Sequence, residues 1–298
     1  MKKIIPVIYC VVALLLFSCD KIKTPIVEKS TVVGSNFITK TNLNVSESRK
    51  ILLEDYTAMK CLNCPRASRT VKNMIDSIYG DELIVLSIHT GGLAQPFAQY
   101  KTDFRTNSGD AWRINYGVTS YPSGVINRKI YGANSILVED TKWTAIVDQA
   151  YNQDQFIVKL NVTTNYDPNV GALNTDVDAI FKKNYSKPLK ICVVAVEDGL
   201  TGVQLDGSVD IEDYEFEHVV RGTINGDWGT DLTTKATKAR DTVSVSFKNF
   251  DLKNSFKYLV PNKEPKPIVV NDQNVSIVVF AYDATTKEVL QVEKVKIR

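Results

Sequence analysis

The stretch from residue 51 to residue 70, ILLEDYTAMKCLNCPRASRT, decides the fold of this chain. Residues 51–56 are mostly apolar and predict a buried strand. Cys61 and Cys64 then form a C-x-x-C motif, and residues 65–79 carry apolar side chains at helical spacing. This segment begins with proline, which suits a first helical turn because that turn needs no amide donor. The sequence therefore predicts a strand, a turn with two cysteines, and a helix.

Residues 49–152 continue this alternation of strands and helices. Residues 83–88 are almost wholly apolar, as expected for a buried parallel strand. A polar insertion at residues 90–109 follows. The remaining predicted elements of this part are a short helix at residues 111–116, a strand at 124–130 and a helix at 141–151. Strands that alternate with helices indicate an α/β domain.

The pattern changes after residue 153. Strand-like runs are separated by Asp-Pro, Asp-Gly and Asn-Gly turn signals, and helical periodicity is nearly absent. The most apolar runs lie at residues 189–196 and 275–282. Many short strands predict an antiparallel β-sandwich over residues 153–298. The expected fold class is therefore α+β, with two domains: an α/β domain followed by a β-sandwich domain.

The first 18 residues have the form of a secretory signal peptide. Two lysines precede a continuous apolar run at residues 7–17, which is too short to span a bilayer. Residues 16–19, Leu-Phe-Ser-Cys, resemble a lipobox, the site where lipoprotein signal peptidase cuts before a cysteine that receives lipid. We expect cleavage after residue 18, acyl chains such as palmitate on Cys19, and a polar tether over residues 19–48. The alternatives are an ordinary signal peptide with an incidental cysteine and, less favoured, an uncleaved anchor.

The charge balance excludes some classes of partner. The chain has 36 basic and 34 acidic residues, and the signal peptide removes two lysines and no acidic residue. The mature chain is therefore formally neutral. Nucleic acids and anionic lipid surfaces both select basic surfaces, so neither is an expected partner.

A C-x-x-C motif at a strand-to-helix junction supports thiol chemistry. A cysteine at a helix N-terminus has its thiolate stabilised by the helix dipole, so Cys61 is the expected nucleophile and Cys64 the resolving thiol. Lys60 adds a positive neighbour, and Asp55 is the expected proton acceptor beneath the pair. Alternatives remain open: the cysteines form a fixed or inert disulfide, or Asp55 merely ends a strand. No metal site is expected, because zinc normally takes four ligands and the two histidines lack ligand spacing.

A second signal lies at Tyr121-Pro122, just before the predicted strand at residues 124–130. In thioredoxin-like folds a cis proline stands before the third strand and packs against the cysteine pair, so we expect Pro122 to be cis. Asp55, the C-L-N-C motif, the helix and this turn follow the order of the thioredoxin superfamily, which residues 49–152 resemble. The resemblance implies thiol–disulfide exchange. Leu-Asn between the cysteines, in place of the common Gly-Pro, leaves the redox direction open.

A further resemblance covers most of the mature chain. Residues 53–65, residues 218–229 and residues 280–291 are similar to the twenty-eight-kilodalton outer-membrane lipoprotein family of Bacteroidetes. That resemblance implies a lipid anchor at the outer membrane, a thioredoxin-like domain and a C-terminal β-domain. It settles the location better than the activity.

The sequence supports two candidate functions. The first is a lipid-anchored thiol–disulfide oxidoreductase that acts on cysteine-containing envelope proteins and needs no cofactor. The second is a non-enzymatic surface lipoprotein whose β-domain binds an unknown partner, with the α/β domain as scaffold. The redox behaviour of the cysteine pair discriminates between them.

Four other residues have plainer interpretations. Cys192 lies in an apolar run and is expected to be a buried small hydrophobe. His89 is expected to pack at the end of a strand, and His218 to lie on an exposed strand among charged residues. Trp228 is expected to anchor the β-domain core or a loop.

Overall fold

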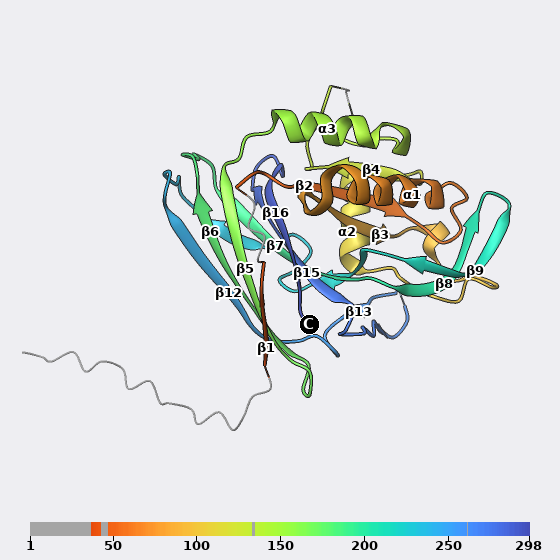
Figure 1. Cartoon of the computed structure of the whole chain (residues 1–298). Helices are drawn as coiled ribbons and strands as arrows, with labels where there is room; N and C mark the ends of the chain where they lie inside the picture. Colours follow the sequence, from red (N-terminus) through yellow and green to blue (C-terminus); the bar gives the residue numbers. More distant parts are fainter. Residues whose placement is uncertain (1–36, 43–46, 133–134, 261) are drawn as a thin grey trace, which may run out of the picture. The chain divides into compact units, whose positions relative to one another are not determined.

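The computed structural model describes residues 37–42, 47–132, 135–260 and 262–298. The signal peptide, Cys19 and most of the tether lie outside the described residues. The chain divides into two compact units, residues 1–35 and residues 36–298, and the described residues all belong to the second. This unit is a mixed α+β fold in which strands predominate, as Figure 1 shows.

An eight-stranded sheet organises the unit. Its strands lie side by side in the order β16 (Val289–Lys296), β15 (Val275–Asp283), β7 (Leu189–Glu197), β10 (Val219–Thr223), β3 (Leu83–His89), β2 (Ile51–Thr57) and β4 (Ser123–Ile126), and β11 (Thr230–Thr233) also pairs with β7. β2 and β3 are parallel, as their apolar composition predicted, and β4 is antiparallel to β2. The predicted strand at residues 124–130 ends early because the backbone becomes left-handed at Asn127 and Arg128.

Helices cover both faces of the N-terminal half of this sheet. α1 (Cys64–Met74) and α3 (Trp143–Gln153) pack on one face through buried residues that include Ala67, Val71 and Trp143. α2 (Asn107–Tyr116) packs on the other face through Trp112. The short helical turns are Ile75–Tyr79, Gly80–Glu82, Gly92–Ala94 and Asp140–Lys142.

A second sheet covers the C-terminal half. Its four strands lie in the order β1 (Ile38–Thr41), β5 (Val158–Asp167), β6 (Ala172–Phe181) and β12 (Thr242–Asp251). Alternate residues of β7 face the core below this sheet, for example Ile191 and Val193, whereas Cys192 and Val194 face the α2 side. Both faces of β7 are therefore buried, which explains its unbroken apolar run. Two small pairs complete the strands, β8 (Leu200–Asp206) with β9 (Val209–Phe216) and β13 (Lys257–Tyr258) with β14 (Lys266–Pro267).

The β-sandwich expected over residues 153–298 is only partly a separate structure. Two sheets do face each other there, but the larger sheet continues across the predicted boundary into β3, β2 and β4. Val219 of β10 pairs with Ser87 of β3 and joins the two halves. Sequence patterning could not show this, because one strand's periodicity does not reveal its neighbour.

A buried ion pair of the N-terminal half lies where the two halves meet. The Arg128 guanidinium and the Glu54 carboxylate meet at 2.6 and 2.9 Å, and both side chains are fully buried. Aromatic rings from both sides of the predicted boundary surround the guanidinium: Trp112, Tyr116, Trp228, Phe280 and Tyr282. Trp228 is thus an anchor in this cluster, as its plainer interpretation predicted.

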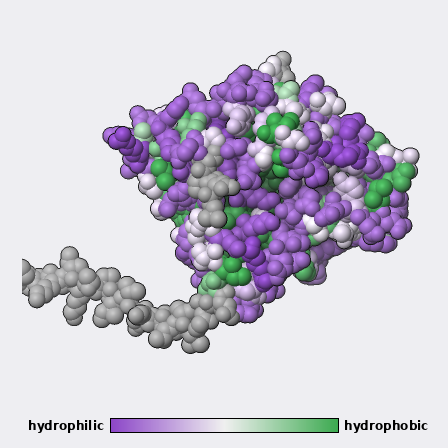
Figure 2. All heavy atoms as spheres, in the orientation of Figure 1, coloured by the Kyte–Doolittle hydropathy of each residue, from purple (hydrophilic) through white to green (hydrophobic). Residues whose placement is uncertain are grey.

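The face seen in Figure 2 is largely hydrophilic, with small scattered apolar groups.

Candidate functional site

The cysteine pair lies in the turn that connects β2 to α1. Cys61 and Cys64 form a disulfide, with their Cα atoms 5.4 Å apart. The expectation that Cys61 begins the helix is wrong: Asn63 is the N-cap and Cys64 is the first helical residue. The Cys61 amide donates to Ala58 O at 3.1 Å, and the Cys64 amide donates to Cys61 O at 3.2 Å. Cys61 therefore sits in a tight turn just before the helix.

The hairpin of β8 and β9 covers this turn. The Leu205 amide donates to Met59 O and the Gly207 amide to Leu62 O, each at 2.9 Å. The Gln204 side-chain amide donates to Cys61 O at 3.2 Å. Cys61 and Cys64 are consequently only 3% and 2% exposed. This cover could not be predicted from the sequence, because the hairpin is far from the cysteines along the chain.

The other predicted neighbours occupy different positions around the pair. The Tyr121–Pro122 peptide bond is cis, as expected, and Tyr121 packs against the cluster that contains both cysteines. Lys60 donates its amide to Leu93 O at 3.3 Å, and its ammonium lies 5.7 Å from the centre of the Phe97 ring. The charge of Lys60 is therefore directed toward Phe97.

Asp55 lies on the face of β2 that α1 covers. Its side chain is buried, and Oδ1 has no hydrogen-bond partner within the described part of the chain. Burial, and secondarily the charge of Asp140, raises the pKa of Asp55 to about 8. The carboxyl group is therefore largely protonated at neutral pH. Asp55 does not end the strand, because β2 continues to Thr57.

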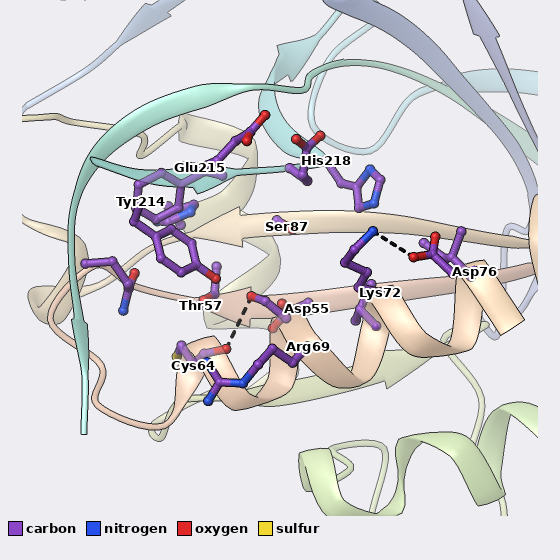
Figure 3. Close-up of a pocket in the computed structure, with 17 residues that line it drawn as sticks. Asp55, Thr57, Cys64, Arg69, Lys72, Asp76, Ser87, Tyr214, Glu215 and His218 are labelled. Atoms are coloured by element: carbon purple, nitrogen blue, oxygen red, sulfur yellow. Dashed lines mark hydrogen bonds and ion pairs between the residues drawn. The ribbon is translucent and has the colours of Figure 1, made fainter. Parts of the chain in front are cut away.

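A cavity of about 530 Å³ lies between α1 and the β8–β9 hairpin, and we call it the α1 cleft. Figure 3 shows Asp55 and Ser87 on its floor, Arg69 and Lys72 on its helical wall, and Tyr214 and Glu215 on the hairpin side. The remaining lining residues are Thr57, Cys64, Ser68, Val71, Ile75, Asp76, His89, Gln204, Phe216, Glu217 and His218. One end of the α1 cleft thus reaches the cysteine pair through Cys64.

His89 also belongs to the α1 cleft. The prediction that it packs is confirmed, because it is 3% exposed and its ring lies edge-on to Phe104 and Phe216. Burial, aided by the charge of Arg221, lowers the pKa of His89 to about 3. Nδ1 lacks a hydrogen-bond partner among the residues described. Ser87 and His89 alternate in β3, so their polarity was the available signal for a cleft floor.

His218 does not lie on an exposed strand, which corrects that interpretation. It is half-buried with positive φ, and its Nδ1 lies 3.1 Å from Asp198. Potential metal-ligand atoms of Asp198, Glu217 and His218 lie within 4.8 Å of one another. The Lys294 ammonium, however, lies 3.2 Å from Asp198 and already supplies a positive charge there. Cys192 is a free, buried thiol, as expected.

Comparison with known proteins assigns this chain to a class of outer membrane proteins. The sequence profile described as "Outer membrane protein Omp28" matches residues 109–298. Because this match covers more than half of the chain, the chain belongs to the Omp28 family, and the resemblance inferred from sequence is confirmed. The family places the protein at the outer membrane. No curated protein matches.

Two solved structures from Porphyromonas gingivalis are similar. The first, "HBP35", has a TM-score of 0.59 and 12% identity, over 84% of this chain and 75% of that chain. This likeness concerns the fold alone. The second, a domain of the outer membrane lipoprotein Omp28, has a TM-score of 0.27 and 20% identity, over 47% of this chain and 88% of that chain. No helix among the described residues is long and apolar enough to cross a membrane.

Proposed function

We propose that this outer membrane protein is anchored by lipid on Cys19 and exchanges disulfides with envelope proteins through Cys61 and Cys64. The arrangement of β2, α1, β3, β4 and α3 supports a thioredoxin-like relationship for residues 49–152. In that part the cysteine pair stands at the start of α1, and the cis Tyr121–Pro122 turn packs beside it. Strands predominate in the part of the chain that follows.

The buried carboxyl of Asp55 is the observation that carries the proposal. A structural disulfide needs no titratable group nearby, and an unpaired buried carboxyl lowers the stability of the folded state. Asp55 nevertheless lines the same cavity as Cys64, with a pKa raised to about 8 by burial. A group that changes protonation near neutral pH beside a disulfide is suited to proton transfer in thiol exchange.

The reaction balances with these groups. A substrate thiolate attacks Sγ of Cys61, a substrate–Cys61 disulfide forms, and the Cys61–Cys64 bond breaks. Cys64 leaves as a thiolate and takes the proton of Asp55. The Asp55 carboxylate then accepts the proton of a second substrate thiol. The resulting thiolate attacks the substrate sulfur that is bonded to Cys61. Cys61 is released as a thiolate and takes a proton from solvent. The substrate gains a disulfide and the pair becomes a dithiol; the reverse sequence reduces a substrate.

Because both cysteines are almost inaccessible, this exchange requires the β8–β9 hairpin to move. Its hydrogen bonds to the turn come from Gln204, Leu205 and Gly207, and in addition Met59 packs with Phe216 while Asp206 pairs with Arg69 of α1. Each hydrogen bond contributes about 1 kcal/mol. In this proposal exchange proceeds through local opening of the cover, which otherwise protects the pair from unspecific thiols.

Trapping tests the proposal. In Cys64→Ser the resolving thiol is gone, so envelope proteins should accumulate as mixed disulfides on Cys61, visible on non-reducing gels. Cys61→Ser is the matched control and should trap few. If neither variant traps a protein and the wild-type pair resists mild reductant, exchange is refuted.

The burial of the pair favours one second candidate. A disulfide held under a hairpin also suits a structural bridge in a non-enzymatic surface protein whose β-domain binds a partner. That function predicts a strongly reducing potential for the pair, below about −300 mV. It also predicts that Cys61→Ser/Cys64→Ser lowers stability and leaves partner binding intact.

A further inference from the structure

The α1 cleft follows the helix over its whole length. On the helical wall the lining runs from Cys64 to Asp76, which is about 18 Å at 1.5 Å per residue. An extended polypeptide advances about 3.3 Å per residue, so this length suits a segment of about five residues. The proportions favour a chain over a compact small molecule.

The floor of the α1 cleft offers two buried polar groups that the protein itself leaves unsatisfied. Asp55 Oδ1 and His89 Nδ1 have no hydrogen-bond partner in the described ranges, and both residues are nine-tenths or more buried. Leaving such groups unpaired costs about 1–3 kcal/mol each. A ligand that pairs with them recovers this free energy.

We propose that the α1 cleft binds an extended polypeptide segment, whose peptide groups pair with Asp55 and His89. β2 and β3 are parallel, with Asp55 opposite Ser87 and Thr57 opposite His89. The two groups therefore lie on one face, about 8 Å apart at their Cα atoms, within reach of consecutive peptide units. A protonated carboxyl donates to a peptide carbonyl, and a neutral imidazole nitrogen accepts from a peptide N–H.

The charged side chains on the walls of the α1 cleft do not favour a charged small ligand. Arg69 forms an ion pair with Asp206 at 2.8 Å, and Lys72 forms one with Asp76 at 2.7 Å. Glu215 and Glu217 also line the cleft and add negative charge to it. Since the cations already have anionic neighbours, a phosphate or carboxylate gains little there. Apolar lining from Val71, Ile75 and Phe216 suits the side chains of an uncharged segment.

The inference deepens the proposed exchange activity, on which its biological meaning rests, because Cys64 lies at one end of the α1 cleft. A segment bound there brings its chain to the cysteine pair. The substrate class is then an unfolded or locally extended part of an envelope protein.

The test uses a fluorescein-labelled ten-residue peptide of Gly, Ser, Thr and Val, without cysteine or charge, and the oxidised full chain. Fluorescence anisotropy should show saturable binding. His89→Leu should weaken it about tenfold, because one charge-neutral hydrogen bond is lost. Ser68→Phe fills the cleft from α1, leaves both floor groups in place, and should abolish binding. Asp213→Ala, an exposed change on the same hairpin outside the cleft, should leave binding unchanged.

Three outcomes overturn the inference. One is no saturable binding to the wild type, as expected of a cleft that holds only water. Another is binding that His89→Leu and Ser68→Phe leave unchanged. Equal affinity for N-acetylvaline amide assigns the cleft to small amides and overturns the polypeptide class. Because the peptide carries no thiol, its binding is independent of whether Cys61 traps mixed disulfides.

Discussion

Asp55→Asn should stabilise the protein, and by an amount that grows with pH. The substitution keeps the side-chain volume and removes the titration. Asp55 has a pKa near 3.8 when unfolded and about 8 when folded, raised by burial and by Asp140. Between these values the native state binds more protons than the unfolded state. The contribution of Asp55 therefore lowers the wild-type stability as pH rises through this window.

The magnitude follows from the same shift. One pKa unit corresponds to about 1.36 kcal/mol. Relative to a side chain that does not titrate, the raised pKa of Asp55 therefore lowers the free energy of unfolding by roughly 4 kcal/mol at pH 7 and by about 2 kcal/mol at pH 5. An asparagine amide left unpaired offsets a constant part of this gain. The difference between variant and wild type should therefore increase by roughly 2–3 kcal/mol from pH 5 to pH 7, whatever the constant offset.

Urea denaturation of the oxidised protein at pH 5, 6, 7 and 8 measures this difference. Other carboxyls with raised pKa, such as Glu217, are present in both proteins and cancel in the comparison. Asp76→Asn, an exposed change on the same side of α1, is the control and should show little pH-dependent difference. A stability difference for Asp55→Asn that stays constant across this range would refute the reasoning about a buried, protonated carboxyl.

Three further predictions concern other parts of the molecule. Arg128→Met leaves Glu54 buried without its partner and should cost about 3–5 kcal/mol in urea denaturation, whereas Arg128→Met with Glu54→Gln should cost less; equal losses would contradict the pairing. Gln204→Ala removes a hydrogen bond from the cover and should speed disulfide reduction by dithiothreitol about fivefold, with exposed Gln273→Ala as the control; an unchanged rate would argue against the hairpin as a barrier. Cys19→Ser should abolish labelling with radioactive palmitate and release the protein from membranes or leave it as precursor; membrane association identical to the wild type would refute the lipid anchor.

The local elements near the site were predictable because local patterns specify them. The strand before the cysteines, the helix after them and the following apolar strand appear as β2, α1 and β3. The cis bond before Pro122 was expected from the thioredoxin-like resemblance, in which a cis proline precedes a strand. The position of Cys61 was missed by one turn, because helix boundaries depend on backbone hydrogen bonds that composition does not reveal.

The sequence by itself determined the alternation of elements, the two-cysteine turn, the membership in an outer membrane family and the expected anchor at Cys19. These depend on residues close together in the chain. Only the tertiary structure decided that β10 joins β3, that the β8–β9 hairpin covers the cysteines, and that Asp55 and His89 share one cleft floor. These features arise from contacts between segments that are distant in the chain. Their pairing depends on the burial of whole faces and on the register between strands, and neither is encoded in a single segment.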